Sequence, residues 1–114
     1  MPPRRPSGWK TWKAIDDLNN ALDIDPARAQ ALVFRASAYR RVNSPELALE
    51  DIQRAVAIDP THPGGLLERG NIRFEAGDRD SARRDWLKIL RLAPWSPSAE
   101  AARLNLGKID VKTK

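Results

Sequence analysis

Cysteine is absent from this sequence of 114 residues, and histidine and methionine occur once each. The absence of cysteine excludes disulfide bonds, thiolate zinc sites and cysteine nucleophiles. His62 has no second histidine with which to share a metal ion or build a catalytic relay, so we interpret it as a loop residue. Adjacent acids such as Asp16 and Asp17 point in different directions on a helix and are typical of a solvated face. We therefore expect no enzymatic activity, no metal and no cofactor.

Long apolar runs are missing as well. No segment approaches the length of a transmembrane helix, and no apolar segment follows the basic N-terminus as it would in a secretory signal. We expect a cytoplasmic protein with no membrane partner. A fragment of a longer or exported protein stays an alternative.

Charge is plentiful and of both signs. Lysine and arginine number 20 against 15 acids, a formal net charge of +5. Acids are interleaved with the bases, which favours a solvated surface over a nucleic-acid-binding one. RNA binding through Arg40, Arg41 and the basic termini is kept as the alternative function, because a positive surplus attracts polyanions.

Proline is the residue that reveals the organisation of the chain. Pro26, Pro60 and Pro94 recur at one fixed interval, which we call the repeat period. The same period links alanines and large apolar residues upstream, namely Ala14, Ala48 and Ala82, and Leu18, Ile52 and Trp86. Each segment between alanine and proline has helical periodicity, and proline ends it because it cannot continue the hydrogen-bond ladder. A repeated helical unit is therefore predicted.

Helical patterns fill most of the sequence. They predict six helices, over residues 8–24, 27–42, 45–58, 63–76, 79–92 and 96–108, and we expect the tail 109–114 to fray. Short loops join them, so neighbouring helices are expected to pack antiparallel around one continuous core.

The residues that recur at the repeat period resemble the tetratricopeptide repeat. One repeat carries Leu32, Arg35, Ala36, Tyr39, Ala48, Ile52, Ala55 and Pro60, and the next carries Leu66, Arg69, Gly70, Phe74, Ala82, Trp86, Ile89 and Pro94. Arg35 and Arg69 depart from the family's leucine, both at the same place. The resemblance implies an all-α, short right-handed solenoid in one domain over 1–114. Its parts are the second helix of a partial repeat (9–26), two repeats (29–62 and 63–96), a C-terminal capping helix (97–108) and a tail (109–114).

The resemblance also implies a function, that of a non-enzymatic scaffold that binds a peptide or partner protein in a concave groove. The groove residues it implies are Val33, Phe34, Ser37, Arg40, Arg41, Leu67, Glu68, Asn71, Phe74 and Asn105. A subfamily that grips chaperone tails uses lysines and asparagines at positions that hold Val33, Ser37, Glu68 and Ala102 here. We therefore predict no such clamp. Apolar Val33, Phe34 and Leu67 together with Arg40 and Arg41 predict a peptide ligand with apolar and acidic residues.

The first repeat is incomplete, because its first helix is missing. Solenoid ends need polar caps, so an uncovered apolar face favours self-association. The residues that we expect in a homodimer contact are Trp9, Trp12, Ile15, Leu18 and Leu22. Folding of Trp9 over its own helix stays an equal alternative.

Overall fold

The computed structural model describes residues 7–112, which form six α-helices joined by short loops. The helices are α1 (Trp9–Ile24), α2 (Ala29–Arg41), α3 (Pro45–Ile58), α4 (Pro63–Glu75), α5 (Arg79–Leu92) and α6 (Pro97–Lys112). Residues 1–6 and 113–114, which include part of the predicted basic termini and tail, lie outside the described residues. None of the helices in this range is long and apolar enough to cross a membrane.

Five of the six helices match the predicted ranges to within two residues, but the prediction for the last one is wrong. α6 does not end at residue 108. It continues because Ile109 is buried with Leu106 in the core beside α5, so tertiary packing holds the turn that the sequence suggested would fray.

The turn that closes each complete hairpin has the same geometry. Asn43 and Gly77, which lie one repeat period apart, both adopt positive φ, at 64° and 88°. The next N–H in each turn reaches back to a helix carbonyl, from Ser44 to Tyr39 and from Asp78 to Arg73. This pattern stops α2 and α4 and directs the following helix back antiparallel.

Two devices stabilise several of the helix starts, a proline in the first position and a side chain that caps the helix. Proline is the first residue of α3, α4 and α6, where its missing N–H costs nothing. Asp78 caps α5 by accepting the N–H of Ser81 at 3.2 Å. Hydrogen bonds from the Ser81 hydroxyl and N–H hold the pKa of Asp78 below its ordinary value.

His62 has a structural role that its interpretation as a loop residue did not include. Its Nδ1 accepts the N–H of Gly65 at 2.9 Å, which caps α4, and its Nε2 lies 2.7 Å from Oε1 of Gln30. Because Nδ1 accepts, Nε2 carries the proton and donates to Gln30. One ring thus joins the start of α4 to α2.

His62→Ala is therefore expected to lower the free energy of unfolding by about 1 kcal/mol, as loss of a helix cap does. His62→Asp keeps a cap and is expected to recover most of this loss. Urea denaturation followed by circular dichroism measures both, and equal stability of the alanine and aspartate variants would contradict the capping role.

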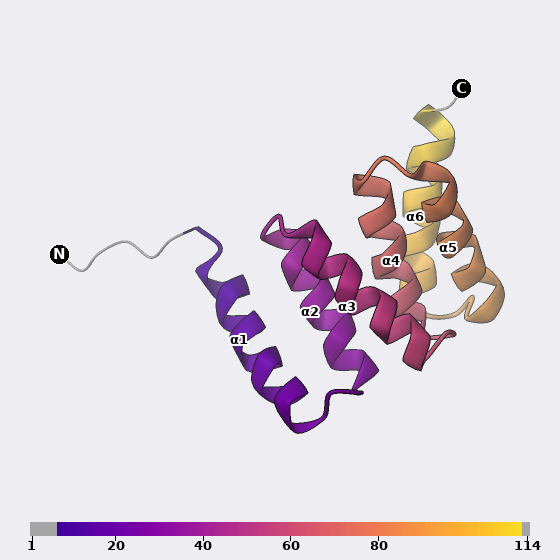
Figure 1. The fold of residues 1–114 in the computed structure, drawn as a ribbon. Coiled ribbons are helices and arrows are strands. Elements are labelled where there is room, and N and C mark those ends of the chain that lie inside the picture. The colour runs from indigo at the N-terminus through magenta and orange to yellow at the C-terminus, as the bar shows by residue number, and fades with distance from the viewer. Residues whose placement is uncertain (1–6, 113–114) are drawn as a thin grey trace.

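The helices form two layers (Figure 1). α2 packs against α3 and α4 against α5 as hairpins, while α2, α4 and α6 also contact one another in a row. α1 contacts α2 alone among the helices of residues 7–112. The row of α2, α4 and α6 forms one face of the stack.

Two apolar clusters replace the one continuous core that we expected. The first centres on Leu32 and Ile52 and the second on Leu66 and Ile89. Between them, α2 and α4 are joined by an ionic contact of Arg40 with Glu68 and Glu75. Ile72 of α4 belongs to the first cluster, so apolar packing and this ionic contact both join the two hairpins.

Buried ion pairs explain the two arginines that depart from the family pattern. Arg35 of α2 binds Asp51 of α3 with two hydrogen bonds of 2.7 Å, and Arg69 of α4 binds Asp85 of α5 at 2.8 and 3.1 Å. Bonding to Asp51 raises the pKa of Arg35 despite its partial burial. The two pairs lie one repeat period apart and fasten each hairpin in the same way.

Candidate functional site

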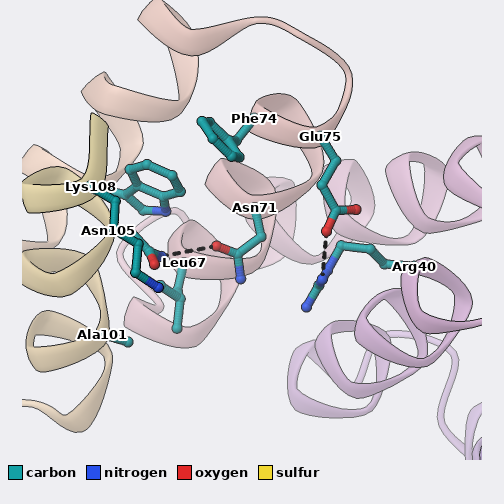
Figure 2. A pocket seen from close by; sticks show the side chains of 9 residues that line it. Arg40, Leu67, Asn71, Phe74, Glu75, Ala101, Asn105 and Lys108 are labelled. Atoms are coloured by element: carbon teal, nitrogen blue, oxygen red, sulfur yellow. Dashed lines mark hydrogen bonds and ion pairs between the residues drawn. The ribbon is translucent and has the colours of Figure 1, made fainter. Parts of the chain in front are cut away.

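A hollow opens on the face formed by α2, α4 and α6. Figure 2 shows it from close by, with Phe74 on one side and the Arg40–Glu75 ion pair on another. Its lining residues come from four helices: Arg40, Leu67, Asn71, Phe74, Glu75, Trp86, Ala101, Asn105 and Lys108. We call this surface the groove.

Two amides face each other in the groove (Figure 2). Nδ2 of Asn105 donates to Oδ1 of Asn71 at 3.3 Å. This contact leaves the amide nitrogen of Asn71 as a donor and the oxygen of Asn105 as an acceptor. Ser37, Asn71 and Asn105 follow one another at the repeat period, so each helix of the face presents a small polar side chain at the same repeat position.

The ionic groups beside the amides are largely paired. Arg40 binds buried Glu68 through Nε and Glu75 through a 2.9 Å hydrogen bond. Burial lowers the pKa of Arg40, but bonding to the two acids outweighs it and raises that pKa. Lys108 is the exposed cation of the lining. The groove therefore carries both signs of charge and little excess of either.

Comparison with known families decides the identity. A family model described as tetratricopeptide repeat matches residues 13–63 and 67–109. The chain belongs to the tetratricopeptide-repeat family. Among curated proteins, no match is found.

Solved tetratricopeptide-repeat structures resemble the chain over most of its length. The first repeat domain of Spaghetti (RPAP3), bound to the HSP90 peptide SRMEEVD, is 30% identical with a TM-score of 0.79, over 91% of this chain and 80% of that one. The second domain of human RPAP3, in complex with the HSP70 peptide SGPTIEEVD, is 28% identical with a TM-score of 0.74, over 89% and 82%. The Yersinia enterocolitica secretion chaperone SycD, in complex with a YopD peptide, shares the fold at 13% identity and a TM-score of 0.77, over 92% and 83%.

These findings confirm the predicted fold and family, and they support the predicted role in protein interaction. The protein is an all-α tetratricopeptide-repeat module, and the family is one of protein-interaction modules rather than of enzymes. Within residues 7–112, no group of three or more His, Asp or Glu side chains is placed to hold a metal ion.

The predicted groove residues fall into three groups in the structure. Arg40, Leu67, Asn71, Phe74 and Asn105 line the groove together. Phe34, Ser37 and Arg41 line a second hollow, between α1 and α2. The prediction is wrong for Val33 and Glu68 as open ligand contacts, because both are buried, Val33 in the first cluster and Glu68 against Arg40.

Trp86 and Lys108 belong to the groove lining but were missed. Trp86 occupies a buried core position of its repeat and reaches the groove lining beside Phe74, with ring centroids 5.8 Å apart. Lys108 was predicted as the last residue of the helix over 96–108, next to the tail that was expected to fray. The repeat register from Phe74 to Lys108 was a usable signal for it.

The predicted self-association face is wrong in two of its residues. Ile15 and Leu22 are 2% and 7% exposed, because this side of α1 packs on α2. Leu18 is half-buried and packs against the first cluster, Trp9 is half-buried, and Trp12 is exposed. The open side of α1 is therefore a different one.

Proposed function

We propose that the groove binds an extended peptide of a partner protein through its main chain. The observation that carries the proposal is the pair Asn71 and Asn105, which offers one donor and one acceptor side by side. An extended peptide presents main-chain carbonyl and N–H groups, and amides that both donate and accept suit such main-chain recognition.

Apolar surface next to the amides suits one side chain of the peptide. Leu67 lies beside Asn71, and Phe74 borders the groove with its ring against the buried ring of Trp86. Aromatic side chains supply large contact areas in interfaces. An apolar residue of the ligand would dock there and Lys108 would accept a polar or acidic neighbour.

An acidic C-terminal tail is not the ligand we propose. The structures of Spaghetti and human RPAP3 hold peptides of HSP90 and HSP70 that both end in EEVD. In this chain Glu75 and Arg40 line the groove, and Arg40 is already bound to Glu75 and to buried Glu68. A further carboxylate would meet Glu75 and a paired arginine, with Lys108 as the exposed cation of the lining, so charge complementarity gives an acidic tail little advantage.

The same pairing argues against the RNA alternative. Arg40 was one of the two groove cations on which it depended, and its charge is balanced by Glu68 and Glu75. We propose a binding module without enzymatic activity of its own. A cytoplasmic location stays a prediction.

Alanine substitution of both amides tests the proposal. Peptides selected for binding to the protein from a random library are expected to lose affinity for Asn71→Ala/Asn105→Ala by about tenfold or more, since each amide hydrogen bond contributes about 1 kcal/mol. Because the main chain is recognised, the loss is expected for peptides of different sequence. Isothermal titration calorimetry measures it, with SRMEEVD as a comparison ligand expected to bind more weakly.

The matched control is Gln53→Ala, an exposed amide on α3 away from the groove, which is expected to leave affinity unchanged. The proposal fails if the double alanine variant keeps its affinity while it remains folded by circular dichroism.

A further inference from the structure

The second helix of each repeat carries one face that can be compared across the protein at the repeat period. In α3 this face is Ala48, Asp51, Ile52 and Ala55, and in α5 it is Ala82, Asp85, Trp86 and Ile89. All eight residues are buried. The equivalent face of α1 is Ala14, Asp17, Leu18 and Ala21, and none of these four is buried. We call it the open α1 face.

Burial of the face in α3 and α5 has the same cause. A helix with an arginine directly before a small residue lies on it, Arg35–Ala36 on α3 and Arg69–Gly70 on α5. The arginine binds the aspartate of the face through both carboxylate oxygens. Such bidentate contacts fix the position of one helix on the other.

Asp17 stands at the same position without such an arginine. Its side chain is 68% exposed, against 4% for both Asp51 and Asp85. Asp17 makes an ionic contact of 3.6 Å with Lys13 on its own helix. Exposed ion pairs of this kind contribute little to stability. Asp17 therefore keeps its capacity to accept a guanidinium.

Residues of α2 that lie next to the open α1 face provide a second contact for a helix bound there. Phe34, Ala38 and Arg41 line the hollow between α1 and α2, together with Ala14, Asp17 and Leu18. Their equivalents on α4 include Glu68 and Glu75, which receive Arg40 of the preceding helix. Arg40 lies five positions after Arg35 in α2. In a helix bound to α1 in the same register, the residue five positions after its arginine would therefore face Phe34 and Arg41.

We propose that the open α1 face binds an amphipathic helix of a partner protein, with arginine directly before a small residue and glutamate five positions after that arginine. The arginine binds Asp17 as Arg35 binds Asp51. The small residue allows close approach over Ala14 and Leu18. The glutamate lays its stem on Phe34, which is 54% exposed, and its carboxylate on Arg41. This surface is separate from the groove.

A second copy of the chain does not supply this helix. Its two arginine–small pairs on first helices are fastened to its own Asp51 and Asp85, with Ala36 and Gly70 buried. Releasing either would open a hairpin. A partner in trans is therefore favoured over the predicted homodimer, and dimerisation becomes an outcome of the test.

The test uses the full chain and a synthetic peptide with the sequence of residues 29–42 in which glutamate replaces Arg40. An isolated helix of this length is only marginally stable, so we expect a Kd on the order of 100 µM. Fluorescence anisotropy of the labelled peptide measures it. Asp17→Asn in the protein, or alanine for Arg35 in the peptide, is expected to weaken binding about tenfold. The two changes combined are expected to weaken binding no more than either one alone, because both remove the same contact.

Two matched controls sharpen the result. Asp16→Asn changes an exposed acid one residue away and is expected to leave binding unchanged. Arg41→Glu in the protein is expected to reverse the preference, so that the peptide that retains Arg40 binds more tightly than the glutamate peptide.

Three results would overturn the proposal. One is the absence of binding that depends on Asp17, seen either as equal binding by Asp17→Asn and Asp16→Asn or as no binding up to millimolar peptide. Another is loss of binding in Asp51→Asn but not Asp17→Asn, which would show insertion in place of α2. The third is a dimer in light scattering that Asp17→Asn dissociates, which would assign the face to a second copy.

Discussion

Gly70→Ala is expected to lower the free energy of unfolding by about 1–3 kcal/mol, although alanine is the better helix former. An added Cβ at Gly70 would lie 2.4 Å from Nε1 and 2.7 Å from Cδ1 of Trp86. These atoms belong to a rigid ring that is 2% exposed, so it has no room to retreat. The missing side chain of Gly70 thus leaves the space that the Trp86 ring fills. In the preceding repeat the equivalent positions hold Ala36 and the smaller Ile52.

A double-mutant cycle isolates this fit. Trp86→Ile alone is expected to cost about 2–4 kcal/mol because it leaves a cavity. In that background Gly70→Ala is expected to be neutral or stabilising by up to about 1 kcal/mol, since the pair now matches Ala36 and Ile52. Urea denaturation of the four proteins gives the coupling energy.

Gly107→Ala provides the control for the glycine substitution itself. Gly107 is exposed in α6, and an added Cβ would meet nothing within 4 Å. Its replacement is expected to stabilise the protein by up to about 1 kcal/mol. Additive costs for Gly70→Ala and Trp86→Ile would show that the two residues do not share one space.

Asp85→Ala is the second change for which we expect a large effect, a loss of about 3 kcal/mol or more. Asp85 is 3% exposed and accepts from Arg69 and from Arg73, the latter at 3.0 Å. Its removal leaves two guanidinium groups without their acid between α4 and α5. Such a loss is dominated by the uncompensated charge rather than by the net value of the pair.

Replacing the charges together should therefore cost less than removing the acid alone. Arg69→Met/Asp85→Leu is expected to be more stable than Asp85→Ala, because apolar residues of similar volume fill the site without a buried charge. Glu50→Ala, an exposed acid on α3, is expected to change stability by no more than about 0.5 kcal/mol. Thermal and urea unfolding compare the three, and a double variant less stable than Asp85→Ala would contradict this account.

Helix number, order and most boundaries were predictable because their signals are local. Proline after each second helix, a residue that tolerates positive φ after each first helix, and apolar periodicity all act within a few residues. The groove was partly predictable for the same reason, since the repeat register places Asn71 and Asn105 on one face. Register alone did not show that Val33 and Glu68 are buried.

The errors concern contacts between residues far apart in the sequence. Arg35 and Asp51 are 16 residues apart and Arg40 and Glu68 are 28 apart, so no local pattern pairs them. The end of α6 was misjudged because Ile109 is held by the second cluster rather than by its own helix.

The open end of the stack was identified from the sequence, but its exposed side was not. The repeat period by itself determined a tetratricopeptide-repeat stack and the place of α1 in it as the second helix of a repeat, because turns and helical periodicity are encoded locally. Only the tertiary structure decided which side of α1 is covered, since that depends on where α2 lies. It buried Ile15 and Leu22 and left Asp17 at the position where each complete repeat receives an arginine.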